Sequence, residues 1–205
     1  ISCVARALLF GIGGAASFNL TLGGGDREKA LFYIGNAATL LFGSGVILGI
    51  VALLCLTPML HFFGSPDNVL AYAQTYTGIT ALGFPFLILT NGGGHLVRAD
   101  GSPRNAMLYN LSGALINTVL DPLFIFVLGF GVQGAAIATV ISQALSAVFV
   151  FVFLTRKSEL KVRFLKKKEF SECIGYAKNI VSLGTAGFIM QLTNSLVSIC
   201  CNNIL

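Results

Sequence analysis

Charged residues are scarce in this sequence. Asp, Glu, Lys and Arg make up only 10% of its 205 residues, whereas a soluble globular domain carries about 25%. Hydrophobic residues make up 55%, and the mean hydropathy is +0.84. This balance excludes an ordinary soluble domain and predicts an integral membrane protein. The net charge of +5 is concentrated in one loop, so we expect no nucleic-acid partner.

Paired cysteines are absent as well. None of the five cysteines forms a CxxC pair, and most lie in apolar segments, where an unpaired cysteine behaves as a small hydrophobic residue. They are Cys3, Cys55, Cys173, Cys200 and Cys201. The sequence therefore offers no zinc or redox motif, and we expect no cofactor.

What the sequence does contain is six long apolar segments. They cover residues 2–22, 31–60, 70–96, 105–128, 133–155 and 180–205. A helix needs about 20 apolar residues to cross about 30 Å of hydrocarbon. The sequence therefore predicts an all-α, multi-helix transmembrane bundle. Because both ends lie in apolar runs, we expect the chain to be a piece of a longer protein.

Positive charge orients these segments in the membrane. The five connections between them carry two, zero, two, zero and eight Lys and Arg residues. Since cytoplasmic loops carry the excess of positive charge, this alternation predicts a multi-pass plasma-membrane protein with three cytoplasmic loops. Those loops follow the helices that end near Leu22, Leu96 and Thr155.

The same pattern divides the chain into three parts. We expect a bundle of five helices over residues 1–155, a basic cytoplasmic loop over 156–179, and an incomplete further helix over 180–205. Eight of the thirteen Lys and Arg residues lie between Arg156 and Lys178. Such a loop is typical of a topology determinant beside an anionic leaflet.

A glycine motif at the fourth connection matches the sequence pattern of a dinucleotide-binding site but lacks the structural context of one. Gly129, Gly131 and Gly134 match GxGxxG, which in dinucleotide-binding folds follows a short strand and precedes an acidic residue by about 20 residues. The apolar segment before Gly129 is too long for that strand, and no acidic residue occurs between Gly134 and Glu159. We expect these glycines to permit a tight hairpin and close helix packing.

One carboxylate lies deep inside an apolar segment. Asp121 follows Asn117 by four residues, so both lie on one face of the predicted helix. A charged Asp at a helix centre costs about 2.5–3.5 kcal/mol, and such residues usually face the bundle interior and mark an ion or proton pathway. The next residue, Pro122, has no N–H, so the carbonyl of Thr118 loses its helical partner.

The following segment supplies a partner at the same depth. If the turn centres on Phe130, Asp121 and Thr139 each lie nine residues from it, about 13 Å along their helices. Their oxygens, with those of Asn117, suit a proton or a small alkali cation such as sodium. We therefore predict a cation or proton site at Asp121, Asn117 and Thr139. The alternative is a set of interhelical hydrogen bonds that only stabilises packing, at about 0.6 kcal/mol per contact.

Three blocks of sequence resemble a known family of transporters. They are RADGSPRNAM at 98–107, NTVLDPLFI at 117–125 and GVQGAAIATVIS at 131–142. Their order and spacing resemble the multidrug and toxic compound extrusion (MATE) family. The likeness extends to residues 11–15 and 23–30 and covers essentially the whole chain.

The resemblance implies a transporter, not an enzyme. Members of the family have two six-helix lobes and export cationic and amphipathic drugs in exchange for protons or sodium ions. This chain would supply helices two to six of the first lobe and the start of helix seven. Its partners would be a drug-like molecule, the lipid bilayer and the second lobe of the same protein. In members whose first lobe binds the coupling ion, the positions of Asn117, Asp121 and Thr139 belong to the site, with an acidic residue on helix one.

Other interpretations stay open. Members that couple through the second lobe have a carboxylate in helix seven, but no Asp or Glu follows Ile180, and Gln191 lies roughly at that position. A lipid-linked precursor flippase of the same superfamily is one alternative, although Arg6 is the only Lys or Arg well inside a segment. A membrane fragment without transport of its own is another. The sequence assigns no residues to the substrate cavity and does not distinguish proton from sodium.

Overall fold

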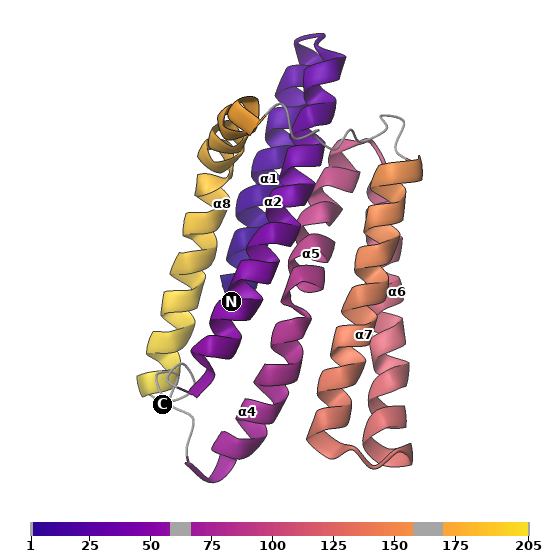
Figure 1. Ribbon diagram of the computed structural model, residues 1–205, viewed down its shortest axis with the longest axis vertical. Helices are drawn as coiled ribbons and strands as arrows, with labels where there is room; N and C mark the ends of the chain where they lie inside the picture. Colours follow the sequence, from indigo (N-terminus) through magenta and orange to yellow (C-terminus); the bar gives the residue numbers. More distant parts are fainter. Residues whose placement is uncertain (1, 58–66, 158–169, 205) are drawn as a thin grey trace.

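Helices account for all regular structure in residues 2–57, 67–157 and 170–204, which the computed structural model describes (Figure 1). This confirms the predicted all-α fold class. The elements are α1 (Ser2–Gly23), α2 (Arg27–Leu54), α4 (Asp67–Leu82), α5 (Phe84–Ala99), α6 (Pro103–Pro122), the π-helix η1 (Leu123–Val127), α7 (Gly131–Val152), the π-helix η2 (Phe153–Lys157) and α8 (Phe170–Ile204).

Five of the described helices are long and apolar enough to cross a membrane. They cover Cys3–Gly23, Arg27–Leu54, Pro103–Val127, Gly131–Arg156 and Ile174–Val197. These helices correspond to five of the six predicted segments, and they confirm a multi-pass membrane protein.

The remaining predicted segment, 70–96, is not one helix. It is divided at Gly83 into α4 and α5, each of 16 residues. Pro85 has no N–H to donate to the Ala81 carbonyl, and its ring crowds that carbonyl, so the helical hydrogen bonds are interrupted just before Phe84. The chain bridges the break with two bonds of 2.9 Å, from Gly83 N–H to the Thr80 carbonyl and from Leu87 N–H to the Gly83 carbonyl.

Helix α8 begins earlier than predicted. Its first described residue is Phe170, ten residues before Ile180. No proline interrupts the stretch from Phe170 to Asn179, so the helix continues without a break. Part of the predicted loop 156–179 lies outside the described residues, and the division of the chain into three parts stays a prediction.

Small residues let α1 pack closely against its neighbours. A Cβ atom placed on Gly13 would meet the backbone carbonyl of Ile180 on α8. A Cβ atom on Gly11 would lie 2.7 Å from the Cα of Gly92 on α5. Helix α1 therefore contacts both helices backbone to backbone, as small residues permit in membrane bundles.

The hairpin between η1 and α7 depends on glycine. Gly129 and Gly131 have φ angles of +68° and +54°, which L side chains rarely adopt. A Cβ atom on Gly134 would lie 2.8 Å from the carbonyl of Phe124. The glycine motif thus forms the predicted tight hairpin, with the start of α7 packed on η1.

Helix α2 begins at a carboxylate cap. Asp26 accepts a 3.2 Å bond from the Lys29 backbone N–H and lies 2.7 Å from the Lys29 ammonium. The hydrogen bond from the Lys29 side chain, followed by the one from its backbone, lowers the pKa of the Asp26 carboxyl. Asp26 is therefore the N-cap of α2, and its side chain satisfies a backbone N–H of the first turn.

Candidate cation site

Asn117 and Asp121 contact each other on α6. The Asn117 amide nitrogen donates a hydrogen bond of 3.2 Å to Oδ1 of Asp121. Both side chains are half-buried. The bond leaves the second carboxylate oxygen of Asp121 and the amide oxygen of Asn117 with free acceptor capacity.

The helix changes its hydrogen-bonding pattern directly after this pair. Pro122 ends α6, and the π-helix η1 begins at Leu123. Within and after η1, Leu128 N–H donates to the Leu123 carbonyl at 3.0 Å. Single π turns often lie at functional sites. The missing proline N–H and the wider turn together loosen the α6 backbone next to Asp121.

Thr139 lies on α7, across the hairpin from α6. Its hydroxyl donates to the Ala135 carbonyl at 2.9 Å, so the proton is engaged within its own helix and the oxygen lone pairs are left for other partners. No hydrogen bond joins Thr139 to Asp121 among the described residues. The structure brings Thr139 and Asn117 to one pocket and joins Asp121 to it through Asn117.

That pocket lies between α5, α6 and α7 and has a volume of about 220 Å³. Its polar lining comprises Thr90 and Asn91 from α5, Asn110 and Asn117 from α6, and Thr139, Ser142, Gln143 and Ser146 from α7. No Lys, Arg, Asp or Glu is among the described residues that line it, so this part of the pocket is polar but uncharged. These residues define the polar pocket.

Amide oxygens enrich the polar pocket in acceptors. The side chains of Asn91 and Asn110 donate to the carbonyls of Leu87 and Ala106 on their own helices, at 2.9 and 3.1 Å. Each amide then keeps one N–H donor and an oxygen that can accept bonds. An acceptor-rich lining beside one carboxylate suits a cation or a hydrogen-bond donor and disfavours an anion.

Two interhelical hydrogen bonds hold the walls of the polar pocket. The Ser146 hydroxyl donates to the Tyr109 carbonyl at 3.3 Å, joining α7 to α6. The Thr90 hydroxyl donates to the Gln143 carbonyl at 3.4 Å, joining α5 to α7. Some of the polar residues therefore stabilise packing. Neither bond involves Asp121, Asn117 or Thr139.

Sequence reasoning missed Asn91, Asn110 and Gln143. Each is a carboxamide inside an apolar segment. Placing a polar side chain in the membrane costs free energy, and that cost was a signal for a polar interior. What could not be seen was that α5 adds a third wall to the site, because the pairing of α5 with α6 and α7 is a matter of tertiary packing.

A sequence profile named MatE matches residues 3–123, more than half of the chain. The chain belongs to the MatE family. Residues 117–121 lie inside the matched region, and Thr139 lies beyond it.

Named relatives and solved structures agree with this assignment. The chain is 30% identical over 156 residues to the multidrug export protein MepA of Staphylococcus saprophyticus, covering 74% of this chain and 34% of that protein. It is 29% identical over 189 residues to MepA of Staphylococcus aureus (strain MSSA476), covering 90% and 40%. It superposes with a TM-score of 0.86 on an outward-facing multidrug resistance MATE family transporter, at 27% identity, covering 98% of this chain and 45% of that one. The chain thus spans between a third and a half of the proteins it resembles.

Proposed function

We propose that the chain forms most of one lobe of a two-lobe secondary antiporter. In this proposal the whole transporter exports organic cations or amphipathic drugs in exchange for protons or sodium ions. The single observation that carries it is the contact between Asp121 and Asn117 at the edge of an uncharged, acceptor-rich pocket between α5, α6 and α7. Family membership and the names of the relatives support the transport of drugs.

Asp121, Asn117 and Thr139 form the coupling site in this proposal. When Asp121 is ionised, its free oxygen, the Asn117 amide oxygen and the Thr139 hydroxyl offer ligands to a cation. When Asp121 is protonated, it becomes a hydrogen-bond donor and loses its charge. A ligand shifts a conformational equilibrium only through different affinities for the two states, and a charge that can be neutralised provides such a difference.

The break in α6 gives the site a way to act on the backbone. Pro122 and η1 interrupt the regular α-helical hydrogen-bond pattern next to Asp121. A change in the charge of Asp121 therefore acts where the backbone resists bending least. The lobe would then change shape with occupancy, and rocking against a second lobe would expose the cavity to alternate sides.

The partners of the chain follow from the same proposal. They are a drug-like cargo, the lipid bilayer and a second lobe of the same protein, with a proton or sodium ion as the only coupling ligand. The loops that contain Asp26 and Asp100, and the connection after Thr155, face the cytoplasm of a plasma-membrane protein. No nucleic acid takes part, and no covalent chemistry is assigned to the chain.

A flippase for lipid-linked precursors is the second candidate function, because Arg6 lies inside α1. Its guanidinium donates to the Ser44 carbonyl on α2 at 3.3 Å, so part of its donor capacity is already engaged. A cavity for an anionic lipid precursor would use more basic residues than this one. A membrane fragment without transport of its own is the remaining alternative.

Transport by the two-lobe protein in sealed vesicles tests the proposal. We expect a fluorescent organic cation to accumulate when an outward gradient of protons or sodium ions is imposed, and not without one. Imposing each gradient separately identifies the coupling ion. Movement of a lipid-linked precursor without any ion gradient would favour the flippase, and inactivity in both assays would favour the fragment without transport.

A further inference from the structure

His95 is an ionisable residue inside the predicted apolar segment 70–96. It lies on α5, and it is half-buried. The imidazole forms no hydrogen bond with any other described residue. Ionisable residues in membrane segments are costly and usually belong to an ion or proton pathway. An imidazole suits a proton pathway, because it changes its charge near neutral pH.

His95 continues one edge of the polar pocket along α5. Asn91 lines the pocket from this helix. At 3.6 residues per turn, His95 follows Asn91 by one turn and lies about 40° from it around the helix axis. Arg98 follows His95 by almost one further turn. The Asn91 edge of the pocket therefore runs on through His95 and Arg98 to the end of α5.

The Asn110 end of the polar pocket lies nearly level with His95. A Cβ atom on Gly94, the residue before His95, would lie 3.6 Å from the side-chain nitrogen of Asn110. His95 lies four residues before Ala99, the last residue of α5, which is about 6 Å along the helix. Asn110 lies seven residues after Pro103, the first residue of α6, which is about 10 Å along that helix. The end of α5 and the start of α6 lie on the same side of the bundle (Figure 1).

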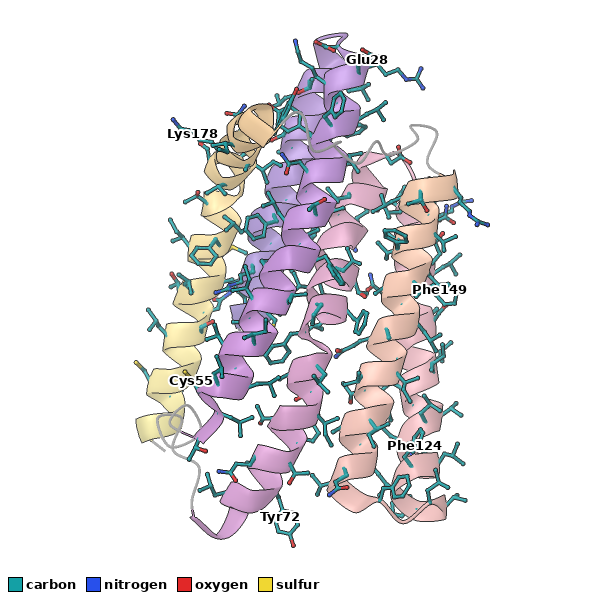
Figure 2. The ribbon with its side chains drawn as sticks, in the orientation of Figure 1. Glu28, Cys55, Tyr72, Phe124, Phe149 and Lys178 are labelled. Carbon is teal, nitrogen blue, oxygen red and sulfur yellow. The ribbon has the colours of Figure 1, made fainter. Side chains whose placement is uncertain are left out.

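Asp121 lies beyond the other end of the polar pocket. Asn117, which donates to Asp121, lies seven residues and about 10 Å beyond Asn110 on α6. Figure 2 shows Phe124, three residues after Asp121, at the opposite end of the bundle from Glu28 in the first turn of α2. In the proposed orientation the start of α2 is cytoplasmic. The pocket therefore extends from the Asp121 pair toward the cytoplasm.

Hydroxyl and amide groups line the pocket between these two ends. Each can donate and accept hydrogen bonds, and a volume of about 220 Å³ holds several water molecules. Water molecules and hydroxyl groups that are joined by hydrogen bonds can pass protons along. An imidazole nitrogen is a poor ligand for an alkali cation, which prefers oxygen. His95 at the cytoplasmic end therefore favours a proton over a sodium ion.

Few ionisable side chains surround His95. They are Arg98 and Asp100, which follow it in the chain, and Arg104 and Tyr109 of α6. The parts of the other helices that pack on α5 near His95 carry none, namely residues 7–23 of α1, 34–54 of α2 and 131–152 of α7. Helix α4 adjoins α5 at Gly83, about 18 Å from His95 along the helix. Of these groups, only the imidazole has an ordinary pKa near neutral pH.

We propose that the coupling ion is a proton and that His95 passes it between the polar pocket and the cytoplasm. This inference rests on the proposed antiport function and adds the identity and the route of the ion. Asp121 releases its proton to water in the pocket, and the neutral imidazole accepts a proton from that water. The imidazolium then releases a proton to cytoplasmic water, so His95 ends the cycle neutral, as it began.

Water must reach His95 from the cytoplasmic side, and this can be measured without transport. In the two-lobe protein without its native cysteines, His95→Cys should react with an impermeant thiol reagent in vesicles whose cytoplasmic face points outward. It should not react when the reagent is applied to the outer face. Leu96→Cys is a matched control that should resist the reagent from both faces, because Leu96 is 0% exposed. Reactivity at residue 95 no greater than at residue 96 would overturn the proposal.

The role of His95 in proton transfer is tested with His95→Gln, which stays polar but does not titrate. We expect efflux of a radiolabelled organic cation, driven by a proton gradient, to slow severalfold in this variant. Exchange of labelled for unlabelled cation without any gradient moves no net proton, so its rate should stay unchanged. Tyr109→Phe removes the ionisable group of the neighbouring helix and should leave both rates unchanged.

Each other outcome contradicts a particular part of the account. An equal loss of efflux and exchange in His95→Gln would mean that His95 supports the fold or the cargo site, and unchanged efflux would mean that protons bypass it. If only a sodium gradient drives the unchanged protein, this inference fails while the proposed antiport stands. If neither gradient drives it, the proposed function fails as well.

Discussion

The side-chain amide of Asn179 donates a hydrogen bond of 2.8 Å to the hydroxyl of Tyr33, joining α8 to α2 across 146 residues of sequence. Aromatic contacts surround this bond. Tyr33 meets Tyr176 edge to face at 4.7 Å between ring centroids, and Phe32 stacks on Tyr176 at 6.3 Å. In the proposed two-lobe protein, α8 begins the second lobe, so this cluster ties the lobes together near the cytoplasmic side.

Removing the Tyr33 hydroxyl should therefore weaken the attachment of α8. We expect Tyr33→Phe to lower the free energy of unfolding in detergent by about 0.5–1.5 kcal/mol, the usual net worth of one hydrogen bond. Tyr72→Phe is a matched control, because Tyr72 is 63% exposed. Equal stabilities of the two variants would show that the bond to Asn179 contributes nothing.

Close packing between α1 and α8 gives a second prediction. Gly13→Ala would push a methyl group into the Ile180 carbonyl, and Gly184→Ala would push one into the Leu9 carbonyl. Each change should destabilise the bundle by about 1–3 kcal/mol, because backbone must move to make room. Gly175→Ala on α8 should be neutral or slightly stabilising, since a Cβ atom there meets nothing within 4 Å. Unfolding midpoints of the three variants decide the matter, and equal values would mean that α1 and α8 are not in backbone contact.

The predicted orientation can be tested by chemical labelling. In a background without the native cysteines, Gly24→Cys and Ser102→Cys should resist an impermeant thiol reagent added outside intact cells and react after permeabilisation. Phe130→Cys, in the turn between η1 and α7, should react from outside. These three sites lie in described turns, so accessibility within the fold is not the limiting factor. Outside labelling at residue 24 or 102 would contradict the cytoplasmic assignment of those loops.

Much of the fold follows from the pattern of apolar residues. Five of six segments match helices because continuous hydrophobic runs of this length have one stable arrangement in a bilayer. The glycine hairpin was predictable too, since Gly129 and Gly131 need positive φ. The break at Gly83 was not predicted, although Phe84-Pro85 carried a local signal for it. Hydropathy averages over a window and hides such a single-residue interruption.

For the candidate site, the spacing of residues along each helix was predictable, but the packing between helices was not. Spacing placed Asn117 beside Asp121, and the structure has that hydrogen bond. Equal depth across the hairpin placed Thr139 nearby, and it shares the polar pocket with Asn117. The contributions of Asn91 and Gln143 depend on how α5 packs against α7. No periodicity within one helix encodes that contact.

Thr139 should matter less than Asp121 for coupling. Thr139→Ala removes one neutral oxygen, which water can replace, so we expect ion-driven efflux by the two-lobe protein to fall by less than about tenfold. Thr139→Ser keeps the hydroxyl and should behave like the unchanged protein. Efflux rates at equal expression provide the measurement. Complete loss of coupling in Thr139→Ala would show that its hydroxyl is an indispensable ligand.

The most direct test of the coupling role is the ion dependence of efflux in Asp121→Asn. This change keeps the size of the side chain and can keep a bond to Asn117, but it removes the charge that can be neutralised. We predict that the two-lobe protein carrying Asp121→Asn inserts and folds normally, and that its efflux no longer responds to a proton or sodium gradient. If efflux and its ion dependence stay unchanged at equal expression, Asp121 only stabilises packing and the proposed coupling site is wrong.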